Sequence, residues 1–174
     1  MAENISIPGN SNKKEKYELL IPQLKSLVEG ENDLIANLAN LAAGIKYGMN
    51  FFWVGFYIVK AHELVLGPFQ GPVACTRIKK GKGVCGKSWE DEKTIIVEDV
   101  DKFPGHIACN AASKSEIVLP LFDSQGKVVM VMDIDSEFIA TFDKTDERYL
   151  LEIVKIIEKN IQRKANNNTM LYTF

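Results

Sequence analysis

The most restrictive feature of this sequence is a pair of apolar segments that a very short connection joins. The segments at residues 117–122 and 127–135 are almost wholly apolar, and only residues 123–126 (DSQG) separate them. Two strands joined this closely pair antiparallel, because a parallel pair needs a crossover of a dozen or more residues. We therefore expect an antiparallel sheet in which this hairpin is one unit.

Three further segments predict strands. Between residues 52 and 58 the side chains alternate with a period of two and are apolar on both faces, so we expect both faces of this strand to be covered. Residues 63–72 follow across a short polar turn, and residues 94–98 (TIIVE) form another candidate strand.

Apolar residues at helical spacing predict two helices before the first strand. One covers residues 16–28, where Pro22 predicts a kink or a restart of the helix. The second covers residues 34–45, and Gly48 is its expected end.

A long amphipathic helix is predicted near the C-terminus, with Asp143 or Thr145 as its cap and an apolar stripe that reaches Ile161. The order of elements predicts an α+β domain, with an antiparallel sheet and the N- and C-terminal helices packed on one face. A length of 174 residues is that of one domain. We expect a flexible lead-in at residues 1–15, a single domain at 16–163 and a polar tail at 164–174.

Composition argues against two broad classes of function. The formal net charge is -2, with 46% hydrophobic and 25% charged residues, so no basic excess indicates a nucleic-acid partner. The apolar runs are too short to span a bilayer, and the polar N-terminus lacks the apolar core of a secretory signal. We expect a cytoplasmic protein, in which the three cysteines are free thiols rather than a disulfide framework.

Three acids are predicted to meet on the hairpin. Asp133 and Asp135 lie two residues apart on one strand, so their side chains share one face, and Glu116 opens the partner strand. One interpretation is that the strand has reached solvent and the acids are hydrated. The other is a pocket in which burial and like charge raise the pKa of a carboxyl, so that it keeps a proton.

Two of the cysteines are candidate nucleophiles. Cys109 lies among small residues in the segment 105–115 (GHIACNAASKS), which suits a loop that a ligand approaches closely. Cys85 lies where glycines lead into an expected helix, and a helix N-terminus lowers the pKa of a thiol. Cys75 lies between strands without a distinctive environment, so physical reasoning leaves Cys85 and Cys109 both open.

Two other kinds of site match parts of the sequence. Residues 81–88 fit the phosphate-loop pattern G-x-x-x-x-G-K-[ST], but the residues before them do not read as the buried parallel strand that such a loop follows. A metal site built from Cys75, Cys85, Cys109 and His106 lacks the close cysteine pairs of structural zinc sites. We favour neither.

Taken together, four stretches of sequence resemble the free methionine-(R)-sulfoxide reductases, which are stand-alone GAF domains of about this length. These stretches are FFWVGFY (51–57), GPFQGPVAC to GKGVCG (67–86), FPGHIACNAASKSEIVLPL (103–121) and MDIDS (132–136). All three cysteines of that family have matching positions here, and the resemblance covers nearly the whole chain after residue 15. It implies a GAF-type sheet.

The resemblance also implies roles for single residues. Cys109 would be the attacking cysteine, and Cys75 and Cys85 would act in resolution. The substrate pocket would be lined by Trp53, Tyr57, Glu116, Asp133 and Asp135, with the three acids also serving catalysis. We expect Cys75 to be the main partner of Cys109, because Cys75 lies in a loop whereas a helix start holds Cys85 more firmly.

The implied reaction needs free methionine sulfoxide and thioredoxin or a similar dithiol, without metal or organic cofactor, and leaves a homodimer open. The strongest alternative from another class is a non-catalytic GAF sensor of a small ligand. We expect such sensors to adjoin an output domain, which this sequence does not contain.

Overall fold

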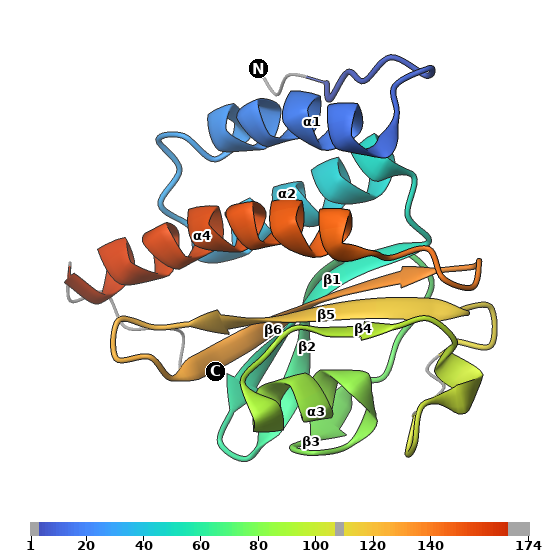
Figure 1. The fold of residues 1–174 in the computed structure, drawn as a ribbon. Coiled ribbons are helices and arrows are strands. Elements are labelled where there is room, and N and C mark those ends of the chain that lie inside the picture. Colours follow the sequence, from blue (N-terminus) through green and yellow to red (C-terminus); the bar gives the residue numbers. More distant parts are fainter. Residues whose placement is uncertain (1–3, 107–109, 167–174) are drawn as a thin grey trace.

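A computed structural model describes residues 4–106 and 110–166, and its centre is a six-stranded sheet in the order β3-β2-β1-β6-β5-β4 (Figure 1). The strands are β1 Trp53–Lys60, β2 Glu63–Gln70, β3 Arg77–Lys79, β4 Ile95–Val97, β5 Ser115–Phe122 and β6 Val128–Ser136. All neighbouring strands pair antiparallel. The predicted antiparallel sheet is confirmed.

The β5–β6 hairpin forms as its short connection predicts. The carboxylate of Asp123 accepts hydrogen bonds from the backbone N–H groups of Gln125 and Lys127, both at 2.9 Å. Gly126 has a φ of 77°, a left-handed conformation that glycine adopts without strain. The turn therefore fixes the register of β5 and β6, in which Glu116 lies opposite Asp135.

The helices lie on both faces of the sheet (Figure 1). Helices α1 (Lys13–Leu27), α2 (Leu34–Met49) and α4 (Lys144–Asn166) cover one face, as predicted for the N- and C-terminal helices. Helix α3 (Gly83–Asp91) lies on the other face with β3, and the 3-10 turn η1 (Val100–Lys102) follows β4. Within the described ranges no helix is both long enough and apolar enough to cross a bilayer.

Two helix boundaries differ from the sequence prediction. Helix α1 runs through Pro22 without a break. Helix α2 ends at Met49 and not at Gly48, and Asn50 caps it with a left-handed φ of 61°. Gly48 instead lies inside the helix. A Cβ on Gly48 would stand 2.8 Å from a methyl group of Leu20 on α1, so the absence of a side chain there lets the two helices approach closely.

The helices at the two ends of the fold extend beyond the stretches where periodicity predicts them. Helix α1 begins at Lys13, inside the expected lead-in, because Asn12 and Glu15 form a capping box. Ile5 and Ile7 pack against the hydrophobic core, and α4 continues to Asn166, beyond the expected end at residue 163. The folded part of the chain is therefore longer at both ends than periodicity indicates.

Alternation along the strands divides the interior into two cores. Met130, Met132 and Ile134 of β6 face the core under α1, α2 and α4. Val131 faces the second core, which α3 covers. Since side chains alternate, Asp133 and Asp135 share the α3 face with Val131. The face opposite the three long helices is therefore the one that carries the acids.

We predict that Asp146→Ala lowers the free energy of unfolding by about 3 kcal/mol. Asp146 is fully buried between α1 and α4, where it accepts from the Tyr17 hydroxyl at 2.8 Å and pairs with the Lys13 ammonium at 2.5 Å. Its loss leaves the buried hydroxyl and the half-buried ammonium without this partner. Urea unfolding measures the change. The control is Glu147→Ala, which removes a surface pair with Lys144 and should cost no more than about 0.5 kcal/mol; equal losses would contradict the prediction.

Candidate active site

A narrow pocket, about 550 Å³ including its open mouth, lies on the α3 face of the sheet. Its walls include Trp53, Tyr57, Cys85, Glu116, Asp133 and Asp135. All five residues that the resemblance assigns to substrate binding are therefore brought together.

Strand register explains how residues so far apart in sequence meet. In β5 and β6, Glu116 pairs with Asp135, and in β1 and β6, Trp53 pairs with Asp135. Gly55 of β1 lies opposite Asp133, and a Cβ on Gly55 would stand 2.3 Å from the Trp53 ring. The indole therefore lies over this glycine, beside the acids.

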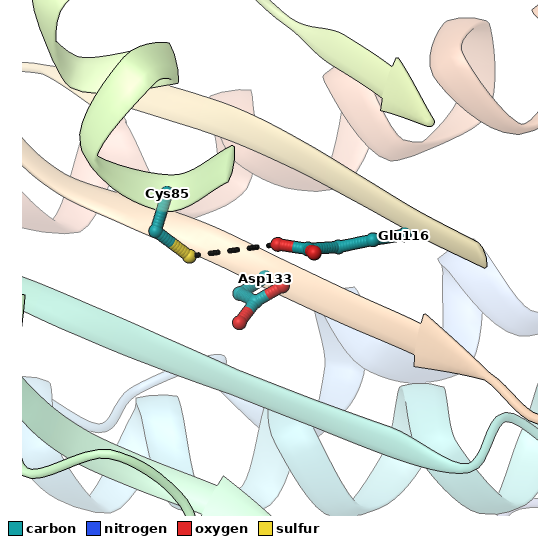
Figure 2. A group of neighbouring side chains, drawn as sticks. All are labelled: Cys85, Glu116 and Asp133. Atoms are coloured by element: carbon teal, nitrogen blue, oxygen red, sulfur yellow. Dashed lines mark hydrogen bonds between the residues drawn. The ribbon is translucent and has the colours of Figure 1, made fainter. Parts of the chain in front are cut away.

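The acids are not hydrated at a strand end. Glu116 is 6% exposed and Asp133 is 7% exposed, so the pocket interpretation holds for both. Figure 2 shows that Cys85 from α3 points toward them, with its Sγ 3.9 Å from Glu116 Oε1. The Oδ1 atom of Asp133 has no hydrogen-bond partner among the described residues.

Burial keeps this cluster of Cys85, Glu116 and Asp133 protonated. Desolvation raises the pKa of Glu116 well above its usual range, and the charge of Asp133 raises it further. Desolvation, followed by the charge of Asp135, raises the pKa of Asp133 in the same direction. Both carboxyl groups therefore hold a proton to higher pH than an exposed acid does, as a proton donor must.

Asp135 differs from the other two acids. Burial raises its pKa to about 6, and a hydrogen bond from the Ser113 hydroxyl works in the opposite direction. With this pKa the Asp135 carboxyl is mostly ionised at pH 7, whereas burial favours the protonated forms of Glu116 and Asp133. Sequence reasoning missed Ser113, although its position just before β5 placed it near the end of β6.

The pocket aromatics also hold a loop. Trp53 stacks on Phe69 with ring centres 5.4 Å apart, and its indole N–H donates to the Pro72 carbonyl at 3.0 Å. The Tyr57 hydroxyl donates to the Cys75 carbonyl at 3.0 Å. The polar tips of both rings thus attach the segment before β3 to the pocket wall.

The three cysteines differ in their surroundings and in their bonding. Cys85 lies in the first turn of α3, as expected, but the expected low thiol pKa is wrong, because desolvation and then the charges of Asp133 and Glu116 raise it. Cys75 is disulfide-bonded, whereas Cys85 is free. Cys109 lies outside the described residues, although His106 and Asn110 on either side of the undescribed segment both line the pocket.

The phosphate-loop interpretation lacks the required geometry. The strand before residues 81–88 is β3, a three-residue antiparallel edge strand, and Lys87 pairs with Glu90 and Asp91 at 2.8 Å each. No buried parallel strand leads into these residues, as a phosphate loop would require.

The cluster of Cys85, Glu116 and Asp133 differs from the metal set considered from sequence. One atom from each residue lies within 4.8 Å of the others. We interpret the cluster as a group that shares protons rather than as a metal centre, since a metal needs deprotonated ligands and burial favours the protonated forms.

Comparison with known proteins gives three close relationships. GAF domain-containing protein A of Dictyostelium discoideum is 58% identical over 159 residues, covering 91% of this chain and 99% of the relative. The free methionine-R-sulfoxide reductase of Saccharomyces cerevisiae is 40% identical over 167 residues, covering 91% and 93%. The free methionine-R-sulfoxide reductase structure from Neisseria meningitidis, in complex with its substrate, superposes with a TM-score of 0.88 at 50% identity, covering 95% and 99%.

The family model described as GAF domain matches residues 29–162. The chain is a GAF domain of the free methionine-(R)-sulfoxide reductase family. This membership confirms the resemblance and the GAF-type fold class that sequence reasoning predicted. Within this GAF domain the pocket lies between α3 and the strands β1, β5 and β6.

Proposed function

We propose that this protein reduces free methionine-(R)-sulfoxide to methionine in the pocket described above. The observation that carries the proposal is the pocket in which three carboxyl groups, two of them deeply buried, lie beside the stacked rings of Trp53 and Tyr57. Sulfoxide reduction needs a proton for the oxygen, and a free amino acid brings an ammonium group that needs a counter-charge. The names of the relatives in yeast and Neisseria agree with this assignment.

Substrate binding divides between the two ends of the pocket. Asp135 is the acid that is ionised at neutral pH, so it holds the ammonium, while Trp53 and Tyr57 offer aromatic surface to the S-methyl group. A methionine sulfoxide within a protein chain has an amide in place of the ammonium. It would therefore bring no positive charge to Asp135, which disfavours that substrate.

The chemical step uses Cys109 as the nucleophile. Its thiolate donates an electron pair to the sulfoxide sulfur, and Glu116 or Asp133 supplies one proton to the oxygen. The oxygen is transferred to Cys109, which becomes a sulfenic acid, and methionine leaves with two more electrons than the sulfoxide carried. Cys85 is the weaker candidate, since its buried thiol beside two acids resists ionisation.

Resolution uses a second thiol, for which we propose Cys75. Its attack on the sulfenic acid forms a disulfide with Cys109 and releases water, and a thioredoxin-type dithiol then reduces the disulfide. Two observations support this order: Cys75 is disulfide-bonded while Cys85 is free, and Tyr57 attaches the Cys75 segment to the pocket wall. Cys85 serves as a secondary partner. A reduced dithiol pool of this kind agrees with the cytoplasmic location expected from the sequence.

The alternative is a GAF sensor that binds a small ligand without chemistry. The two functions separate in one assay, in which the wild-type protein is incubated with free methionine-(R)-sulfoxide and excess dithiothreitol. We expect methionine to form over many turnovers. Binding of the sulfoxide, seen as a rise in melting temperature, without any methionine would favour the sensor and contradict the proposal.

A further inference from the structure

Ser113 is held firmly at the edge of the pocket by the backbone around it. It ends a turn in which Asn110 accepts hydrogen bonds from the N–H groups of Ala112, at 2.9 Å to its side chain, and of Ser113, at 3.2 Å to its carbonyl. The next residue, Lys114, donates its N–H to the Ser136 carbonyl on β6 at 2.7 Å. Ser113 is 7% exposed, and its hydroxyl donates to Oδ1 of Asp135, which directly precedes Ser136.

Of the three acids in the pocket, Asp135 is the one that accepts the hydrogen bond from the Ser113 hydroxyl. Asp133 has an oxygen without a partner among the described residues, and Glu116 has the Cys85 thiol near it. Three carboxyl groups that line one narrow pocket, two of them buried, cannot all be ionised together, because like charges in a poorly solvated site repel each other strongly. A donor that reaches one acid and not the others therefore decides which of them carries the charge.

The described pocket wall offers no cation that could take this role. The titratable groups that face Asp135 are Glu116 on β5, Asp133 on β6, Cys85 on α3, Tyr57 on β1 and His106 after η1. Four of them are acids or neutral groups, and burial lowers the pKa of His106, so that this histidine is neutral at pH 7. The Ser113 hydroxyl is thus the donor that favours the charged form of Asp135 within the described wall.

We propose that Ser113 is a positioning residue that makes Asp135 the ionised member of the three acids and thereby assigns Asp135 to the ammonium of the substrate. The proposal rests on the proposed function for the identity of that ammonium. It leaves Glu116 and Asp133 as the protonated pair. Removing the hydroxyl should weaken recognition of the amino group at neutral pH without removing a proton donor.

The direct test is a titration of the Asp135 carboxyl carbon by NMR in the substrate-free protein, with the signal assigned through Asp135→Asn. The wild-type pKa should lie at about 6, and Ser113→Ala should raise it by about one unit, since a hydrogen bond to the carboxylate favours the charged form. Ser113→Thr keeps the hydroxyl and should restore the wild-type value. Ser113→Gly, which also removes the hydroxyl, provides the same measurement if the alanine variant is unstable.

The matched control is Ser115→Ala. Ser115 is also buried, and it donates its hydroxyl at 2.7 Å to the Phe138 carbonyl, not to a carboxylate. Its removal should leave the Asp135 titration where it is. An unchanged titration in Ser113→Ala, or an equal shift in Ser115→Ala, would overturn the proposal. Because this measurement needs no turnover, its result does not depend on the proposed reductase activity.

Enzyme kinetics supply the second readout. The kcat/KM for free methionine-(R)-sulfoxide should rise with pH as Asp135 ionises, and in Ser113→Ala this rise should move to higher pH. At pH 7 the variant should be about 2-fold less efficient, because a rise of about one unit from a pKa of about 6 halves the ionised fraction of Asp135, and the difference should nearly vanish by about pH 9. A loss of the same factor at every pH would indicate a purely structural role and contradict the proposal.

Discussion

Cys109→Ser is expected to abolish reduction of free methionine sulfoxide, with kcat/KM lower by at least about 10³-fold. Serine has nearly the same size as cysteine, but its hydroxyl does not form a nucleophilic anion at neutral pH. The variant should therefore fold and melt like the wild type. Methionine formation by amino-acid analysis measures the loss, and thermal melting confirms the fold.

The two other cysteines provide the matched comparison. Cys75→Ser should still release about one equivalent of methionine per subunit without a dithiol, because the chemical step precedes resolution, but should recycle poorly with thioredoxin. Cys85→Ser should keep a measurable single turnover, and peptide mapping of the oxidised wild type should find mainly Cys75 joined to Cys109. An active Cys109→Ser together with an inactive Cys85→Ser would transfer the nucleophile's role to Cys85.

Asp133→Asn is expected to lower kcat by about 10²-fold while leaving KM within a few-fold. Asp133 is buried, which raises its carboxyl pKa, and one of its oxygens has no partner among the described residues, so it can donate a proton to the sulfoxide oxygen. Asparagine keeps the shape but has no proton to give. Steady-state kinetics with dithiothreitol as reductant measure both parameters.

Asp135→Asn is the control for that variant, since it removes the negative charge of the pocket rather than a proton donor. Its main effect should be a higher KM, because the ammonium loses its counter-charge. If kcat and KM change by the same factors in the two variants, the different roles assigned to the two acids are wrong.

The sheet and its helices could be predicted because local signals determine them. The DSQG turn between two apolar segments permits one type of pairing, and the spacing of apolar residues identifies α1, α2 and α4. Other features depend on tertiary contacts that leave no local signal. β3 is an edge strand of only three residues. Gly48 lies inside a helix and not at its end, and the close packing of Leu20 from another helix against it leaves no local sequence signal.

In the site, too, local sequence signals predicted some features, whereas others depend on tertiary packing. The period of two placed Asp133 and Asp135 on one face, but it could not show whether solvent or α3 covers that face. The helix start at Cys85 was visible in sequence, whereas the burial that raises its thiol pKa arises from packing across the sheet. The family resemblance predicted which residues line the pocket. It did not identify Ser113, whose role became evident only from its hydrogen bond to Asp135.

The most direct test of the central claim follows the two epimers of free methionine sulfoxide separately, with wild-type protein and dithiothreitol. A racemic mixture and its N-acetylated form are compared by chiral chromatography over the same time course. We predict complete consumption of the free R epimer, persistence of the S epimer, and little turnover of the N-acetylated sulfoxide, which lacks the ammonium that Asp135 binds. Equal consumption of both epimers, or equal turnover of the N-acetylated compound, would contradict this account.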